Sequence, residues 1–232
     1  MSPLLTRFLP EHRVIGFAPT GLSVRGQSIA CDPAYGPEPW HGALARLQEM
    51  ELGKARVTIE LSCHFVRYAL VPWSEALATP AEEEAYVRHH FARIHGERAK
   101  SWAVRAAEAA PGEPRLASAI DSALLASLKE TFRGKQAKLV SVQPVLMSRF
   151  NAARKALPPG GAWLVLAEPE RACIALHGGK GWRSVQNAKG AWRAALERER
   201  LRVEGAVPSL VFLAGAPLPS NEESFEFKAL TA

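Results

Sequence analysis

Cysteine is scarce in this sequence, and its placement suggests neither a metal site nor a disulfide framework. The 232 residues include only Cys31, Cys63 and Cys173, and no two of them form a Cys-x-x-Cys pair. No pair of histidines lies near them at the spacing of metal ligands. An odd set of separated thiols is typical of a reducing compartment, where cysteine acts as a small apolar core residue. We therefore expect no metal site and a cytoplasmic location.

Long apolar runs are also missing from the sequence. No stretch approaches the roughly 18 apolar residues that span a bilayer. Pro3, Arg7 and Pro10 interrupt the apolar residues near the start, so no secretory signal is expected there. The sequence therefore predicts a chain without a membrane-spanning segment.

Common catalytic and nucleotide-binding motifs are not found either. The sequence contains no Gly-x-Ser-x-Gly elbow, no P-loop and no Gly-x-Gly-x-x-Gly after a strand. Gly178–Gly181 includes a lysine but joins two predicted strands, so we interpret it as a hairpin turn. His89 and His90 are neighbours on a predicted helix and point about 100° apart, which does not suit one metal ion. We predict no catalytic residue, no cofactor and no metal ligand.

Positive charge, in contrast, is present and is concentrated in one segment. The net charge is +6, and residues 171–202 hold eight Lys or Arg against Glu197 and Glu199, an excess equal to that of the whole chain. Such a segment suits nucleic acid, anionic lipid or an acidic protein surface. The alternative is a solvated helix face, because Arg193 and Glu197 sit at helical spacing. The candidate basic-surface residues are Arg171, Lys180, Arg183, Lys189, Arg193 and Arg198.

Strand and helix patterns alternate along the whole chain. Apolar alternation and turn residues predict a first hairpin over 14–26, a second over 57–71 with its turn at Ser62–His64, and a meander of three strands over 163–185. Single strands are expected at 116–120, 138–142 and 210–213, and an edge strand at Phe225 and Phe227. Helices are expected near 44–50, 80–95, 122–133, 145–157 and 191–201.

One helix start is especially well specified. Thr79 can cap the helix, Pro80 suits the first helical position, and Glu82 completes a capping box. Gly96 is expected to end this helix.

The Pro158–Gly161 segment, Pro-Pro-Gly-Gly, is the strongest linker candidate. On each side of it the chain shows antiparallel strands, then a helix, then another strand. Strand runs followed by helices indicate a mixed α/β or α+β architecture.

This order of elements resembles that of the pilus-assembly PilM proteins and of the cytoplasmic domain of the type II secretion protein GspL. Ile15–Val24 looks like the opening hairpin of that fold. Val57 to about Ala110, with Leu70–Pro72 and the Glu-rich helix after it, looks like a small inserted domain. The resemblance implies an α/β, actin-like fold made of two ribonuclease-H-like units. The implied boundaries are 1–56 with 114–157 for the first unit, 57–113 for the inserted domain and 158–232 for the shortened second unit.

An ATPase with the implied fold needs an Asp after the first strand of each unit, followed by small residues whose N–H groups hold phosphate. Ala18 and Pro19 stand at the first of these positions, and proline has no N–H. Glu168–Glu170 stands at the second, where two carboxylates would repel phosphate. Leu213–Ala216 is similar to an adenosine-binding turn only in its small residues. The resemblance combined with these departures predicts a pseudo-ATPase.

The resemblance therefore implies a non-enzymatic scaffold of a type IV pilus or type II secretion platform, cytoplasmic and peripheral to the inner membrane. Its expected partners are inner-membrane assembly proteins, which contribute a cytoplasmic peptide or domain. A secretion or assembly ATPase and anionic lipid are further candidates. The candidate protein-binding residues are Phe65, Arg67, Tyr68 and Trp73.

Three alternatives stay open. Phe65 and Tyr68 could instead pack inward, which would remove them from any binding surface. The chain could be an actin-like nucleotide-binding ATPase with atypical loops. It could also be a basic nucleic-acid-binding protein, although it has no recognisable nucleic-acid motif.

Overall fold

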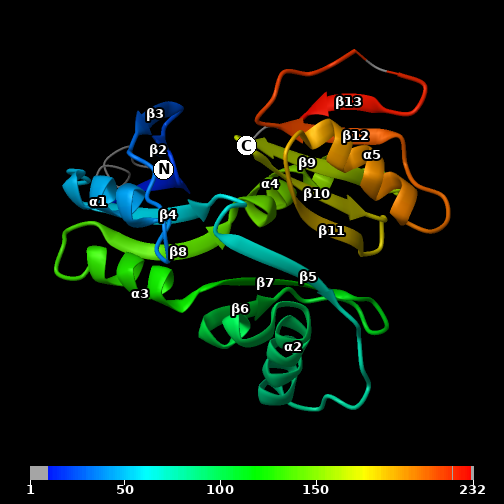
Figure 1. Cartoon of the computed structure of the whole chain (residues 1–232), viewed down its shortest axis with the longest axis horizontal. Coiled ribbons are helices and arrows are strands. Elements are labelled where there is room, and N and C mark those ends of the chain that lie inside the picture. The colour runs from blue at the N-terminus through cyan, green and yellow to red at the C-terminus, as the bar shows by residue number, and fades with distance from the viewer. Residues whose placement is uncertain (1–9, 221, 231–232) are drawn as a thin grey trace, which may run out of the picture. The chain divides into compact units, whose positions relative to one another are not determined.

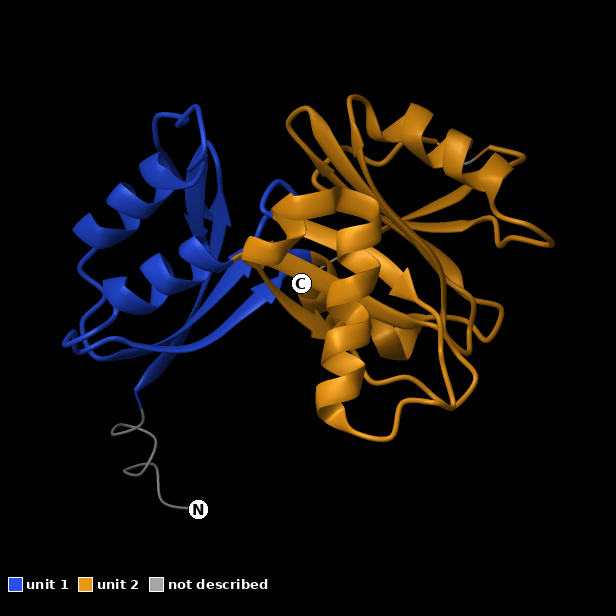
Figure 2. Cartoon of the chain, turned by 60° about the horizontal axis from the view of Figure 1, so that its bottom comes forward, with its two compact units in different colours: residues 1–65, 122–145 blue, residues 66–121, 146–232 orange. Residues whose placement is uncertain are grey.

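The computed structural model describes residues 10–220 and 222–230, and the chain divides into two compact units (Figures 1 and 2). Unit 1 comprises residues 1–65 and 122–145, and unit 2 comprises residues 66–121 and 146–232. Each unit thus contains two separate stretches of the chain, and each is described by itself.

Unit 1 contains one five-stranded mixed sheet in the order β3-β2-β1-β4-β8. Strands β1, β2 and β3 form an antiparallel meander, and β4 and β8 run parallel to β1. Ile15, Phe17 and Ile59 are buried, as are Leu47 and Leu128 from its helices. The elements are β1 (Glu11–Ala18), β2 (Gly21–Val24), β3 (Gln27–Ala30), α1 (His41–Glu49), β4 (Ala55–Leu61), α3 (Ser122–Thr131) and β8 (Lys138–Pro144).

Unit 2 contains a second five-stranded sheet, in the order β11-β10-β9-β12-β13. Here too a three-stranded antiparallel meander is followed by two strands parallel to the first. Trp163, Ile174, Leu196 and Phe225 form part of the core between this sheet and α5. The elements are β9 (Ala162–Glu168), β10 (Arg171–His177), β11 (Trp182–Lys189), α5 (Trp192–Arg202), β12 (Leu210–Ala214) and β13 (Glu226–Ala229).

The two large sheets share one topology. When the strands of each sheet are numbered in chain order, they lie side by side in the order third, second, first, fourth, fifth. This finding confirms the prediction that the two parts of the chain follow a common plan. They differ in one connection, because α3 precedes β8, whereas the described residues between β12 and β13 contain no helix.

A smaller antiparallel sheet, β5-β7-β6, belongs to unit 2 and interrupts the chain between β4 and α3. Helix α2 packs on this sheet through Val87 and Phe91, which are buried against Ala117 and Ala119. The elements are β5 (Val66–Val71), α2 (Pro80–His95), the 3₁₀ helix η1 (Gly96–Ser101), β6 (Trp102–Ala106) and β7 (Arg115–Asp121). Helix α4 (Val145–Ala153) and the 3₁₀ helix η2 (Arg154–Ala156) lead into β9.

Two sequence predictions about strand pairing are corrected here. The predicted hairpin over 57–71 is wrong, because β4 pairs with β1 and β8 while β5 pairs with β7. The chain does turn at Ser62, whose carbonyl accepts a hydrogen bond from the Phe65 N–H (3.0 Å), but it passes there from one sheet to another. The predicted boundary at 56/57 falls inside β4, so this strand lies in the first sheet rather than in an inserted domain.

Several other local predictions are confirmed: the first hairpin, the meander of β9, β10 and β11, and the edge position of β13. The short strands β3 and β6 were not predicted. Both are only four or five residues long, and such short runs produce a weak periodicity signal.

The capping box at the start of α2 generates a stability prediction. Thr79 Oγ1 accepts a hydrogen bond from the Glu82 N–H (3.2 Å), and Glu82 Oε2 accepts one from the Thr79 N–H (2.9 Å). Replacing Thr79 by Ala leaves the Glu82 N–H without this acceptor, so we expect a loss of about 1 kcal/mol in the free energy of unfolding. Urea denaturation of Thr79→Ala and of Thr79→Ser, which keeps the hydroxyl, measures this loss. Equal stability of the two variants would contradict it.

Candidate binding groove

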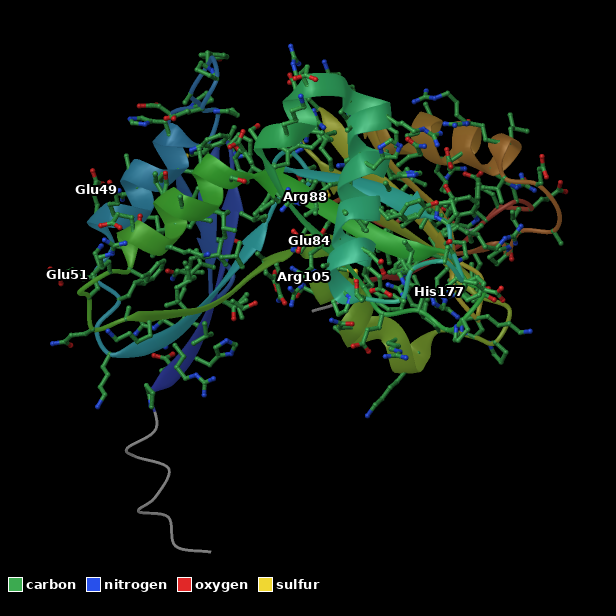
Figure 3. All side chains as sticks on the ribbon, turned by 90° about the horizontal axis from the view of Figure 1, so that it is seen from below. Glu49, Glu51, Glu84, Arg88, Arg105 and His177 are labelled. Carbon is green, nitrogen blue, oxygen red and sulfur yellow. The ribbon has the colours of Figure 1, made fainter. Side chains whose placement is uncertain are left out.

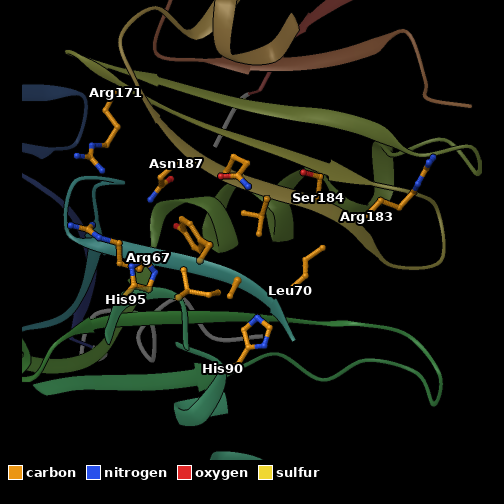
Figure 4. Close-up of a pocket in the computed structure, with 13 residues that line it drawn as sticks. Arg67, Leu70, His90, His95, Arg171, Arg183, Ser184 and Asn187 are labelled. Carbon is orange, nitrogen blue, oxygen red and sulfur yellow. The ribbon is translucent and has the colours of Figure 1, made fainter. Parts of the chain in front are cut away.

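A groove of about 540 Å³ lies in unit 2 along strand β5. Residues 67–70 of β5, the C-terminal half of α2 and residues 183–187 of β11 line it, together with Arg171 at the start of β10 (Figure 4). Two distant stretches of the chain, 67–95 and 171–187, thus form one concave surface.

Two edge strands position this groove. β5 is the outer strand of the small sheet, and β11 is the outer strand of the large one. Asn187 Nδ2 on β11 donates a hydrogen bond to the Val66 carbonyl on β5 (2.7 Å), which joins the two strands at one point. The same carbonyl accepts a bond from Arg67 Nη1 (3.1 Å). The strands are therefore held together at Val66 by side chains rather than by a ladder of backbone bonds.

The ionisable side chains that line the groove are all basic, apart from the phenol of Tyr68. Its lining includes Arg67, Arg171 and Arg183 as well as His90 and His95, but no Asp or Glu. Burial, and next the nearby charge of Arg171, lower the pKa of the Arg67 guanidinium below its ordinary value. Arg67 and Arg171 thus hold like charges near each other in partly buried surroundings.

The three arginines differ in what their guanidinium groups contact. Arg183 donates to the carbonyls of Ala206 (2.6 Å) and Glu204 (2.5 Å), so its donors are engaged by a loop. Arg171 Nε is buried and has no hydrogen-bond partner among the described residues. A buried donor of this kind normally has a partner. Arg67 and Arg171 lie at the same end of the groove in Figure 4.

Two histidines of α2 complete the polar lining. The His95 ring stacks on Phe91 (6.2 Å between centroids) and meets the edge of Trp102 (5.0 Å). Burial, and next the charge of Arg67, lower the pKa of His95. Burial, and next the charges of Arg93 and His89, lower the pKa of His90. Both rings are consequently neutral at neutral pH, and acid would add positive charge to the groove.

An apolar side chain lies at the rim. Ile94 of α2 is 55% exposed although it is a large aliphatic residue, and with Leu70 of β5 it contributes apolar surface to the groove. The site can therefore contact an aliphatic group beside a negatively charged one.

A second groove, of about 470 Å³, runs between the N-terminal half of α2 and β6. Its charges are mixed and largely paired: Glu83 binds Arg115 (2.5 Å) and Glu84 binds Arg88 (2.8 Å). Figure 3 labels Glu84 and Arg88 on α2 and Arg105 on β6. This groove thus has no dominant charge, unlike the groove along β5.

The predicted protein-binding residues fall into separate places. Phe65 is buried in unit 1 with its ring against Phe17 (5.5 Å between centroids), so its use on a binding surface is corrected to core packing. Arg67 and Tyr68 line the groove along β5. Trp73 is half-buried beyond the end of β5 and does not line it.

The predicted basic surface is likewise divided. Arg171 and Arg183 line the groove, whereas Lys180, Lys189 and Arg198 are exposed elsewhere in unit 2. Arg193 packs its guanidinium over the rings of Phe225 (5.3 Å) and Phe227 (5.0 Å). It also pairs with Glu197 (3.1 Å) and with Glu222. The basic segment is therefore not one continuous patch.

Three residues of the groove were not predicted from the sequence: His95, Asn187 and Ile94. His90 and Ile94 are four residues apart, which places them on one face of α2, and this spacing was the available signal. Nothing local in the sequence indicates that Asn187 reaches a carbonyl of β5.

The hairpin ends of the two large sheets have no room for a phosphate-binding loop. Ala18 pairs directly with Gly21, and Glu168 pairs directly with Arg171. Each turn thus has only two residues, and the first of them is a proline, which lacks an N–H. The third position considered, Gly215, lies so close to β9 that a Cβ there would overlap the Ala167 carbonyl.

Within residues 10–220 and 222–230, no group of three or more His, Cys, Asp or Glu is placed to hold a metal ion. Among the same residues, no helix combines the length and apolarity required to cross a membrane.

The lowered histidine pKa values predict that the chain loses stability in acid. Burial, and next the charge of Arg154, also lower the pKa of His177. Below an unfolded-state pKa of about 6.5, the unfolded chain binds more protons at His90, His95 and His177 than the folded chain does. The free energy of unfolding should therefore fall as the pH decreases through this range.

Urea denaturation between neutral and mildly acidic pH measures this effect. We expect His95→Gln to have a shallower pH dependence than the unmodified chain, whatever its absolute stability. His41→Gln, at an exposed position of α1 in unit 1, is the control for loss of a histidine. A pH dependence unchanged by His95→Gln would contradict the assignment.

No protein-family model matches the sequence, and no curated protein matches it significantly. Solved structures do match it. The cytoplasmic domain of EpsL, an inner membrane component of the type II secretion system of Vibrio cholerae, is 14% identical, with a TM-score of 0.57 over 94% of this chain and 89% of that chain. A Bacteroides thetaiotaomicron protein with an actin-like ATPase fold and unknown function is 12% identical, with a TM-score of 0.58 over 94% and 86% of the two chains.

A chain of the PilM–PilN type IV pilus biogenesis complex is 18% identical, with a TM-score of 0.50 over 82% of this chain and 66% of that chain. The sequence resemblance to PilM and to a type II secretion component is thus matched by similarity of structure. At these low identities the likeness establishes the fold, which confirms that prediction: the chain is a mixed α/β protein with the actin-like fold.

Proposed function

We propose that this protein is a non-enzymatic scaffold of a bacterial type II secretion or type IV pilus platform at the inner membrane. It binds a cytoplasmic segment of an inner-membrane assembly protein. The similarity to the EpsL cytoplasmic domain and to the PilM–PilN complex supports this setting. A secretion or assembly ATPase and anionic lipid are additional contacts of the same proposal.

The observation that carries the non-enzymatic part is the structure of the two hairpin ends. Phosphate binding by a strand turn depends on several backbone N–H groups that point at one anion. The turns at Pro19 and Pro169 have two residues each and begin with a residue that has no N–H. The acidic side chains of Glu168 and Glu170 flank the second turn and would repel phosphate.

The observation that supports the binding part is the groove along β5. It lies at a strand edge, and exposed strand edges accept extended peptides in several recognition modes. Its arginines are of the residue type enriched at binding hot spots. The residues assigned to partner binding are Arg67, Tyr68 and Arg171.

The nucleotide-binding alternative makes the opposite prediction about ATP. A site occupied at a hundred times its Kd would stabilise the chain by about 2.7 kcal/mol. We expect no rise in Tm with Mg-ATP and no Mg²⁺-dependent phosphate release. If a rise occurred and Glu168→Ala or Glu170→Ala abolished it, relocated ligands would be shown and the scaffold proposal would be wrong.

The partner itself is tested by affinity capture from solubilised inner membranes of the source cells. We expect the tagged chain to retain a membrane-spanning assembly protein with a short cytoplasmic segment, and a synthetic copy of that segment should compete for it. Salt-sensitive binding of DNA or RNA, without such a partner, would instead favour the nucleic-acid alternative.

A further inference from the structure

Strand β6 is an edge of the small sheet, and the second groove runs along it beside the N-terminal half of α2. We propose that this edge binds an extended segment of a partner protein, which adds to the small sheet as a fourth strand antiparallel to β6. The segment has aliphatic residues at alternate positions, an acidic residue opposite Arg105 and a basic residue opposite Glu108. This surface is separate from the groove along β5, so the inference goes beyond the proposed function.

The first step concerns the direction of the backbone groups of β6. In an antiparallel pair of strands, residues that exchange hydrogen bonds alternate with residues that do not. The Ala107 N–H donates to the Leu116 carbonyl of β7 (2.8 Å), so Arg105, two residues earlier, is also bonded to β7. Val104 and Ala106 alternate with these residues in the register, and their N–H and C=O groups therefore point away from β7.

A side chain of α2 supports this direction. The Trp102 carbonyl, which shares the alternation of Val104 and Ala106, accepts a hydrogen bond from Arg88 Nη1 (3.0 Å). Within the described part of the chain, the outward backbone groups of Val104 and Ala106 have no such partner. The outer edge of β6 is thus occupied at its first residue and open at its third and fifth. Open backbone groups at a sheet edge are a template for pairing with another chain.

The second step concerns the shape of the groove beside this edge. Residues 104–109 line it in succession, and α2 lines its other side through Pro80, Glu83, Glu84 and Val87. Six residues of extended chain are about 20 Å long. The groove of about 470 Å³ is within the size range of sites for small ligands. It therefore fits a short extended segment better than a folded domain.

The face of the edge that α2 covers is apolar. Val104 and Ala106 pack against the core that contains Val87, and all three residues line the groove. In a strand added to β6, the residues directly opposite Val104 and Ala106 place their side chains on this same face. Aliphatic side chains at these alternate positions therefore bury apolar surface against all three residues.

The third step concerns the two exposed charges of the run. Arg105 and Glu108 have no ion-pair partner among the described residues, whereas the remaining charged residues of the groove lie in ion pairs. Opposite charges directly across a strand pair are favourable, and like charges there are unfavourable. In an antiparallel segment this requirement places a basic residue three positions before an acidic one.

The other sheet edges are less suited to an added strand. Strands β3 and β13 are only four residues long. Strand β8 is bulged opposite Val57 and ends in Pro144, and strands β5 and β11 are joined to each other at Val66 by Asn187. Short, bulged and proline-containing edges resist added strands. In contrast, β6 is followed by three further residues that line its groove.

The test measures binding of a fluorescein-labelled peptide, Lys-Thr-Val-Glu-Val-Thr, to the full chain by anisotropy. Antiparallel pairing places its two valines opposite Ala106 and Val104, its glutamate opposite Arg105 and its lysine opposite Glu108. A matched peptide has the same side chains but carries N-methyl groups on both valines, which removes the two N–H donors that face β6. We expect saturable binding of the first peptide and an affinity at least about tenfold lower for the second.

Variants of β6 locate the site. Ala106→Pro removes an outward N–H but no hydrogen bond to β7, and it should weaken binding about fivefold. Ala106→Ser keeps this N–H and should leave the affinity unchanged. Arg105→Glu should weaken binding about threefold, and a peptide with lysine in place of its glutamate should restore the affinity. The Tm of each variant shows whether it is folded.

Amide hydrogen exchange, followed by NMR, identifies the strand that the peptide contacts. We expect slower exchange of the Val104 and Ala106 amides and unchanged exchange of the Leu70 amide on β5. Slower exchange at Leu70 alone would overturn the proposal, because the contact would then lie in the groove along β5.

Three binding results would also overturn it. The first is no binding of the unmodified peptide by the folded chain. The second is an affinity that neither N-methylation of the peptide nor Ala106→Pro changes. The third is tighter binding of Glu-Thr-Val-Lys-Val-Thr, in which the two charges are exchanged, because this peptide places like charges opposite Arg105 and Glu108.

The result is independent of the proposed function, because it is measured with synthetic peptides and this chain alone. If the peptide does not bind but an inner-membrane partner is captured, the scaffold function stands and the inference about β6 fails. If the peptide binds at β6 but no such partner is captured, the inference stands and the assigned platform is wrong.

Discussion

The contact on which the groove depends is the hydrogen bond between Asn187 Nδ2 and the Val66 carbonyl (2.7 Å). It joins an edge strand of the small sheet, β5, to an edge strand of the large sheet, β11. Arg67 follows Val66 directly, and Arg171 pairs with Lys189, two residues beyond Asn187, in the adjacent strand. The bond therefore holds the two arginines near each other, and the strands leave space for a ligand beyond it.

The positive groove is a feature that packing alone would not favour. Burial, and next the charge of Arg171, lower the pKa of the Arg67 guanidinium. Burial, and next the charge of Arg67, lower the pKa of His95. Perturbed ionisable groups gather at functional sites because the same proximity that costs stability prepares the site for a charged ligand. Elsewhere in unit 2, Arg193 pairs with Glu197 and Arg115 with Glu83.

The proposed function separates the actin-like fold of this chain from the chemistry of an actin-like ATPase. Both large sheets retain the same strand order, but the turns that would face a nucleotide are reduced to two residues that begin with Pro19 and Pro169. A fold is held by its core, such as Trp163 and Ile15, whereas activity depends on a few residues at strand ends. In the proposed scaffold the core maintains the fold, and the surfaces serve to bind partners.

Much of the secondary structure could be predicted from local sequence. Thr79, Pro80 and Glu82 specify the start of α2 through hydrogen bonds within four residues, and apolar alternation specifies the first hairpin and the later meander. Only the tertiary structure decided that β4 pairs with β1 and β8 rather than with β5, and that Arg67, His95 and Arg171 share one groove. Pairing of distant strands depends on long-range contacts that local periodicity does not encode, which is why the sequence alone determined the elements but not the site.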